Sequence, residues 1–227
     1  MLRTLKRVAA AAVVLALFSA GAARAASEQQ NLVEKARITL DDLRRDKEFG
    51  NARELMHRAR GVMIVPSLVK GGFFFGGEGG DAVMMARGSD GTWSQPSFYT
   101  LASASFGLQI GLEEAEVVMI VLSDRAFNAF MSDEFKIGAQ AGLAVVTLGS
   151  EAEAATTSHL NADIVVWSSA TGLYGGITLN GSLIKPHTSY NEAYYGQAEN
   201  PVDILVQRRA PHLPQSDRLD QALASIS

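Results

Sequence analysis

The sequence predicts an α+β fold: a mainly antiparallel β-sheet or barrel-like sandwich with N-terminal helices packed on it. Three observations favour this class. An amphipathic helical pattern follows residue 26, short strand-like runs fill most of the chain from residue 61 to about residue 185, and glycine-rich turns separate these runs. Blocks in which glycine stands beside aromatic residues are typical of tight β-hairpins with close backbone approach.

The first 25 residues have the pattern of a secretory signal peptide. Basic residues precede an apolar run over residues 8–20, and Ala23-Arg24-Ala25 gives a small-x-small cleavage sequence. An uncleaved anchor is disfavoured because a spanning helix needs roughly 18–20 apolar residues. We therefore expect cleavage before Ala26 and a mature protein in the periplasm or outside the cell, peripheral to a membrane where it meets one.

Charge and cysteine content exclude several functional classes. Residues 1–25 contain four basic and no acidic residues, so their removal changes the formal net charge from −4 to −8. An acidic chain argues against nucleic acid as a partner. The sequence has no cysteine, which excludes disulfides, thiol nucleophiles and lipoprotein anchors. We expect one domain over residues 26–207 and a polar tail over residues 208–227.

The first predicted element is a helix from Ser27 to about Lys47. Its apolar positions recur on one face, and its charged positions lie mostly off that face; among the basic ones are Lys35, Arg37, Arg44 and Arg45. Two interpretations remain open at this point: a helix docked on the core with a solvated charged face, or an interfacial membrane helix. A second, short helix is predicted over residues 52–60.

Strands dominate the next part of the chain. A buried strand is predicted over residues 61–65, ended by Pro66, and further strands over residues 73–77, 82–86, 97–101, 105–110, 117–122, 143–147, 164–168, 173–179 and 182–184. One helix interrupts them, with Ser123 as its cap and Ala126, Phe127 and Phe130 on its inner face. Asn200-Pro201 begins another helix or turn, and a last helix is predicted over residues 216–225.

No segment has the residues that catalysis or metal binding requires. The glycine-rich block over residues 71–80 lacks the lysine and helix context of a phosphate loop, and the four histidines lack zinc-ligand spacing. Glu113, Glu114 and Glu116 are more typical of a solvated turn than of an acid–base pair. Trp93 and Trp167 fit core packing better than a ligand pocket. We predict a protein that is not an enzyme and has no cofactor.

Several segments, in this order and spacing, resemble the SYLF domain family over roughly residues 30–207. They are Ala59-Arg-Gly-Val-Met-Ile-Val-Pro66, Lys70 through Gly80, Trp93-Ser-Gln-Pro-Ser-Phe98, Gly107-Leu-Gln-Ile-Gly111, Gly172-Leu-Tyr-Gly-Gly176, Asn180-Gly-Ser182 and Asn191-Glu-Ala-Tyr-Tyr-Gly196. The resemblance implies phospholipid binding without catalysis and, in eukaryotic members, phosphoinositide and actin binding. For an exported bacterial-type chain we expect no actin partner, and other anionic phospholipids or a membrane surface as ligand.

The predicted lipid-binding site combines aromatic and basic residues. Phe73, Phe74 and Phe75 cannot all face the core of one strand, because neighbouring side chains alternate between faces. We predict that they act with Lys70 and with the helical residues Lys35, Arg37, Arg44 and Arg45. In the alternative, Phe74 is covered by the N-terminal helix and the loop is purely structural. The alternative function is a structural or protein-interaction module in envelope maintenance, with an envelope protein as partner.

Overall fold

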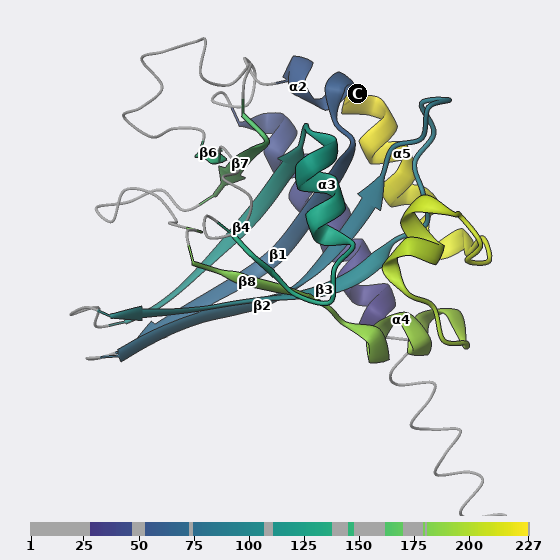
Figure 1. Ribbon diagram of the computed structural model, residues 1–227. Coiled ribbons are helices and arrows are strands. Elements are labelled where there is room, and N and C mark those ends of the chain that lie inside the picture. The colour runs from purple at the N-terminus through teal and green to yellow at the C-terminus, as the bar shows by residue number, and fades with distance from the viewer. Residues whose placement is uncertain are drawn as a thin grey trace, which may run out of the picture.

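The centre of the molecule is one eight-stranded sheet with the strand order β5-β8-β3-β2-β1-β4-β7-β6 (Figure 1). The structure is a computed structural model that describes residues 28–46, 53–72, 75–106, 111–137, 145–147, 162–169, 179 and 181–226. The predicted signal peptide and nearly all of the strand predicted over residues 173–179 lie outside these residues. The α+β class with a mainly antiparallel sheet is confirmed.

Neighbouring strands are antiparallel except for β6 and β7, which are parallel. The strands are β1 (Gly61–Gly72), β2 (Phe75–Ala86), β3 (Ser97–Phe106), β4 (Gly111–Val121), β5 (Phe135–Lys136), β6 (Val145–Thr147), β7 (Ile164–Ser168) and β8 (Leu183–Pro186). The helices are an N-terminal helix over residues 28–45, α2 (Arg53–Arg58), α3 (Asp124–Phe130), α4 (Thr188–Tyr195), the π-helical turn η4 (Val202–Val206), the 3-10 turn η5 (Pro214–Ser216) and α5 (Asp217–Ile226).

The N-terminal helix packs across one face of the sheet, as its apolar periodicity predicts. Leu40 and Leu43 are fully buried. Two polar contacts fix the helix on the strands: the Thr39 hydroxyl donates to Glu116 Oε1 at 2.7 Å, and Trp167 Nε1 donates to Asp46 Oδ2 at 2.9 Å. Figure 1 shows this helix in purple behind β1 to β3.

The other face of the sheet is covered by α3, and its sequence signals are confirmed. Ser123 is the cap, with its hydroxyl accepting from the backbone N–H of Ala126 at 3.1 Å, and the inner positions Ala126, Phe127 and Phe130 are buried. The Tyr99 hydroxyl of β3 donates to the carbonyl oxygen of Phe130 at 2.9 Å. The sheet therefore lies between two helical layers.

Strand β1 does not end at Pro66, so that prediction is wrong. The pairing with β4 shifts by one residue between Val65 and Leu68, and the pairing with β2 shifts by one residue between Ile64 and Val69, which marks a β-bulge. A proline lacks the N–H that a regular ladder requires, and a bulge is a place where the ladder is already interrupted. The strand therefore continues to Gly72, and residues 75–77 of the first run predicted after it belong, with the run predicted over residues 82–86, to the single strand β2.

The carboxylates at positions 113, 114 and 116 lie in strand β4, so the predicted solvated turn is wrong. Glu116 is half-buried beneath the N-terminal helix, and this burial raises the pKa of its carboxyl group. Glu114 is exposed and accepts a hydrogen bond from the Ser67 hydroxyl at 2.5 Å. The hydrogen bond of Glu116 with Thr39 ties the N-terminal helix to β4, and that of Glu114 with Ser67 ties β1 to β4.

Gly80 of β2 lies against the bulge of β1 and has no room for a side chain. An added Cβ would meet the backbone oxygen of Ser67 and would lie 3.0 Å from Cγ1 of Val65. Because backbone atoms cannot give way, Gly80→Ala is expected to lower the free energy of unfolding by about 1–3 kcal/mol in urea denaturation.

Gly79→Ala is the matched control, because its Cβ would lie 3.6 Å from the nearest atom, the backbone oxygen of Leu101. That variant should keep the wild-type stability or gain slightly, since alanine restricts the unfolded chain more than glycine does. Equal destabilisation by both substitutions would contradict the role assigned to the bulge.

Helix α4 was not predicted, and it docks on the segment from Trp93 to Phe98. The Phe98 N–H donates to Asn191 Oδ1 at 2.8 Å, the His187 N–H donates to the Phe98 carbonyl at 2.8 Å, and the Tyr195 hydroxyl donates to the Pro96 carbonyl at 2.6 Å. Two blocks of the family resemblance thus bind each other. Trp93 and Trp167 are both buried, which confirms their expected packing role.

The C-terminal residues join the same core. The predicted last helix is confirmed as α5, whose Leu219 and Leu223 are fully buried. Arg208 donates to Oγ1 and the carbonyl of Thr92 at 2.6 and 2.7 Å, and Gln95 Oε1 accepts from the Leu213 N–H at 2.9 Å. The residues after 207, expected to be a polar tail, therefore include a helix that packs on the domain.

Candidate functional site

The basic residues predicted on the N-terminal helix are exposed or half-buried, but most of them pair with carboxylates of the same helix. Arg37 contacts Glu34 at 2.9 Å and Asp41 at 2.5 Å, and the hydrogen bond with Glu34 raises the pKa of its guanidinium group. Arg44 and Arg45 likewise face an acidic residue three positions earlier, at 3.6 and 2.8 Å.

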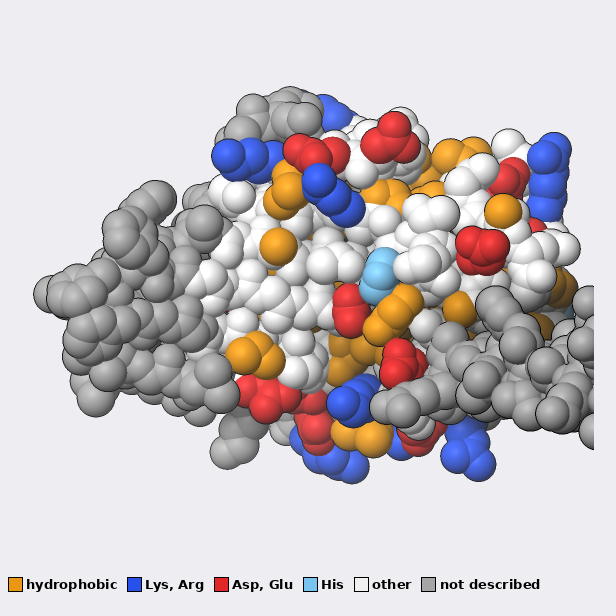
Figure 2. Space-filling view, turned by 90° about the horizontal axis from the view of Figure 1, so that it is seen from below, with side chains coloured by type: hydrophobic (Ala, Val, Ile, Leu, Met, Phe, Trp, Pro, Cys, Tyr) orange, Lys and Arg blue, Asp and Glu red, His pale blue; other side chains and the backbone are white. Residues whose placement is uncertain are grey.

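These pairs leave no excess of positive charge on the helix. Residues 28–46 contain five acidic and four basic residues; of the basic ones, Lys35, Arg44 and Arg45 are exposed. Exposed ion pairs contribute little to stability, but each places a negative charge next to the positive one. Figure 2, which views the molecule from below, shows blue and red side chains beside each other among the described residues and no continuous basic patch on the side seen.

Lys70 lies on the opposite face of the sheet from the N-terminal helix. Glu116 faces that helix, so Glu114, two residues earlier on the same strand, faces it too. Val69 is the direct partner of Glu114, and Lys70 must therefore point the other way. The structure does not bring Lys70 together with Lys35, Arg37, Arg44 and Arg45.

The immediate neighbours of Lys70 are acidic. It is directly opposite Glu78 on β2 and Glu113 on β4. Glu78 is buried and accepts a hydrogen bond from the Ser103 hydroxyl at 2.6 Å. Opposite charges in direct cross-strand positions attract each other, and Lys70 is thus part of a mixed-charge row.

Of the three predicted phenylalanines, Phe75 alone belongs to a described strand. It is the first residue of β2, and its backbone is paired with that of Phe106 on β3. Phe73 and Phe74, which connect β1 to β2 along the chain, lie outside the described residues.

We call the segment formed by residues 68–72, 75–80, 102–106 and 111–115 the arm. In Figure 1 it extends to the left, away from all the labelled helices. On the side of the sheet that carries the N-terminal helix, its described surface consists largely of small uncharged residues: Gly77, Gly79 and Ala102. Val69, on the same side, keeps 39% of its surface exposed. Among the described side chains of the arm, Glu114 is the charged one on this side.

Three further observations on the described residues concern metal binding, a buried carboxylate and membrane-spanning helices. Within them, no group of three or more His, Asp and Glu residues is arranged to hold a metal ion. The buried Asp163 accepts from the Ser123 hydroxyl and pairs with Arg125 at 2.6 Å, which ties the start of α3 to β7. None of the helices in the described ranges is both long enough and apolar enough to span a bilayer.

Comparison with known proteins gives consistent matches. Residues 102–226 match the model of the Ysc84 family, described as "Las17-binding protein actin regulator". "LAS seventeen-binding protein 3" of Saccharomyces cerevisiae is 32% identical over 175 residues, covering 76% of this chain and 38% of that protein. "SH3 domain-containing YSC84-like protein 1" of Homo sapiens is 31% identical over 171 residues, covering 75% of this chain and 49% of that protein. The chain thus matches half or less of the length of these relatives.

Proposed function

The chain belongs to the Ysc84 family, the SYLF family that its motifs resemble, and we propose that it is a non-enzymatic protein that binds phospholipid at a membrane surface. The observation that supports this proposal is the arm. It projects beyond the labelled helices, and on the side of the N-terminal helix its described residues are mostly small and uncharged. Its sequence continues from Gly72 into Phe73 and Phe74.

The proposed attachment depends mainly on apolar contact. Electrostatic adsorption gains about 1 kcal/mol per unpaired cation near an anionic surface. Most basic residues of the N-terminal helix face carboxylates at short distance, and the mature chain has a net charge of −8. Transfer of a phenylalanine side chain out of water gains about 1.5–3 kcal/mol. We therefore assign attachment to the arm and not to the helix.

The proposal places the mature protein in the bacterial cell envelope, in the periplasm or outside the cell. It follows from the signal-peptide pattern over residues 1–25. The relatives named for binding Las17 belong to eukaryotes. An exported chain does not meet actin, and the proposal does not include it as a partner.

Vesicle co-sedimentation tests this function with the mature chain and vesicles of phosphatidylglycerol and phosphatidylcholine. We expect binding that changes little between low and moderate salt, and Phe74→Ser should weaken it at least about tenfold because one apolar anchor is lost. Val206→Ser is the matched control, since Val206 is 53% exposed in η4 and outside the arm. Absence of binding to all vesicles at every salt concentration, low salt included, would refute the proposal.

A second candidate function is protein binding in envelope maintenance. The match to relatives named for binding another protein favours it. In the described part of the sheet, the edge strands β5 and β6 have two and three residues, and such short edges are poor templates for an added strand. A mature protein that ignores vesicles and forms a stoichiometric complex with a defined envelope protein would favour this second function.

A further inference from the structure

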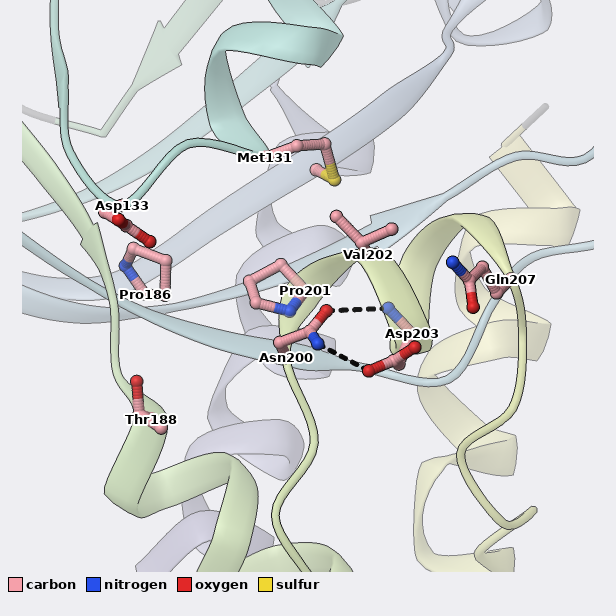
Figure 3. A pocket seen from close by; sticks show the side chains of 9 residues that line it. All are labelled: Met131, Asp133, Pro186, Thr188, Asn200, Pro201, Val202, Asp203 and Gln207. Atoms are coloured by element: carbon pink, nitrogen blue, oxygen red, sulfur yellow. Dashed lines mark hydrogen bonds between the residues drawn. The ribbon is translucent and has the colours of Figure 1, made fainter.

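A cavity of about 490 Å³ lies away from the arm, where the end of α3, the end of β8, the start of α4 and the turn η4 meet (Figure 3). This volume is within the range of about 300–1,000 Å³ that small-molecule pockets occupy. In Figure 3 one wall is formed by Asp133, Pro186 and Thr188, and the facing wall by Asn200, Pro201 and Val202.

The second wall is held in place by a π-helical turn. The side chain of Asn200 accepts from the backbone N–H of Asp203 at 3.0 Å and donates to its carboxylate at 2.5 Å. The Gln207 N–H donates to the Val202 carbonyl oxygen at 2.9 Å and so completes the turn. Single π-helical turns are frequent at functional sites.

The second residue after this turn is also unusual. Arg208 has a φ of 53°, which is uncommon for a residue other than glycine. Its guanidinium group donates to Oγ1 and the carbonyl of Thr92, and these contacts hold the end of η4 against the β2–β3 connection. The cavity wall is thus fixed by the protein itself, as preformed ligand sites are.

The charge around the cavity is negative. Its lining contains two carboxylates and neither lysine nor arginine among the described residues. Asp203 is engaged by Asn200 and by Arg209 at 3.5 Å. Asp133 is exposed at the cavity wall beside Pro186, and no hydrogen bond or ion pair joins it to another described residue (Figure 3). The nearest basic residue in sequence on β8, Lys185, is paired with Glu134 at 2.7 Å.

We propose that this cavity binds the ammonium group of a small organic amine. Asp133 supplies the negative charge, and the Thr188 hydroxyl is a second acceptor on the same wall; both residues are exposed to solvent. A charge-assisted hydrogen bond from an ammonium to a carboxylate is about twice as strong as a neutral one. Pro186, Pro201 and Val202 provide apolar surface for the methylene groups of the ligand. This site is separate from the arm and does not depend on membrane attachment.

Ethanolamine and ethylene glycol are the probes, because they differ in an ammonium group against a hydroxyl on the same two-carbon frame. We expect a saturable NMR titration of the ¹⁵N-labelled mature chain by ethanolamine in the millimolar range, with shifts at residues 131–133, 186–188 and 200–203. Ethylene glycol should cause none of these shifts. Equal shifts from both probes, or no saturable shifts from ethanolamine, would overturn the proposal.

Asp133→Asn keeps the size of the side chain and removes its charge, and it is expected to weaken ethanolamine binding about two- to fivefold, because the ion pair is exposed to solvent. Glu54→Gln is the matched control: it removes one exposed negative charge on α2, which does not line the cavity. Wild-type affinity in the Asp133 variant, or equal weakening in both variants, would refute the assigned role of Asp133.

Soluble short-chain lipids distinguish the source of the amine. Dihexanoyl phosphatidylethanolamine that binds more tightly than ethanolamine at the same residues would indicate a lipid headgroup, and equal or weaker binding would indicate a free amine. Both outcomes support the ammonium site, whereas equal binding of dihexanoyl phosphatidylglycerol would refute it. Failure of vesicle binding by the arm leaves the ethanolamine titration unaffected, so the two proposals fail separately.

Discussion

Replacing Phe98 by alanine is expected to lower the free energy of unfolding by about 3–5 kcal/mol, the range for a large aromatic side chain removed from a core. Phe98 is fully buried, and its ring meets those of Tyr194 and Tyr190 edge-on, with centroids 5.0 and 6.2 Å apart. Its backbone N–H and carbonyl also bind Asn191 and His187. The substitution would leave an empty space between β3 and α4. The hydrogen bonds of Asn191 and His187 with the Phe98 backbone prevent α4 from moving in to fill it.

Urea denaturation at neutral pH measures this loss, with Phe98→Leu as the control that keeps most of the volume. The leucine variant should lose less than about 1.5 kcal/mol, because volume-conserving core exchanges are tolerated. An alanine variant as stable as the leucine variant would show that α4 moves to fill the space and is not fixed by its hydrogen bonds.

The stability of the protein is expected to fall steeply above pH 10, by about 4 kcal/mol per pH unit. Burial raises the pKa of Tyr99, Tyr194 and Tyr195 far above the ordinary value of 10.0. Above pH 10 the unfolded chain releases three phenolic protons that the folded protein keeps. Stability that is complete below pH 10 is therefore lost as the pH rises towards the folded-state pKa values.

Urea denaturation between pH 9 and pH 11, repeated on Tyr99→Phe, tests this dependence. Tyr99 donates one hydrogen bond to the Phe130 carbonyl, so the variant should be only slightly less stable at neutral pH, by about 1 kcal/mol. Its alkaline slope should be about two thirds of the wild-type slope, because one of the three protons is gone. Identical slopes would mean that Tyr99 ionises equally in the folded and unfolded states.

The sequence predicts best those elements whose buried residues follow one regular pattern along the chain. The N-terminal helix and α3 have apolar residues on one face, and α3 also has a capping serine. Strand β7 is found over residues 164–168 as predicted, because it is a continuous run of β-branched and aromatic residues between turn signals. Helix α4 was missed because Thr188–Tyr195 consists mainly of poor helix formers without apolar periodicity. Its stability comes from contacts with Phe98 and Pro96.

The sequence identifies residues of the candidate site, but it does not predict on which face of the sheet each of them lies. Up to Val65, alternate residues of β1 point to the α3 side, and an uninterrupted strand would turn Lys70 towards the N-terminal helix. The extra residue between Val65 and Leu68 reverses this alternation. A bulge depends on pairing with residues far along the chain, so a local sequence pattern does not reveal it. The same holds for the cavity, whose lining residues come from four separate parts of the chain.

The pairing of early with late segments also determines when the molecule completes its folding. The bond from Trp167 to Asp46 and the contacts from Asn191 and Tyr195 to the Pro96–Phe98 segment each join residues about a hundred positions apart. Closing such large loops costs entropy before any contact compensates for it, so folding rates fall as contacts become more distant in sequence. As the chain is synthesised, β1 to β4 are complete long before α4 exists. We expect a slow final folding step that begins only after residues 183–195 have emerged.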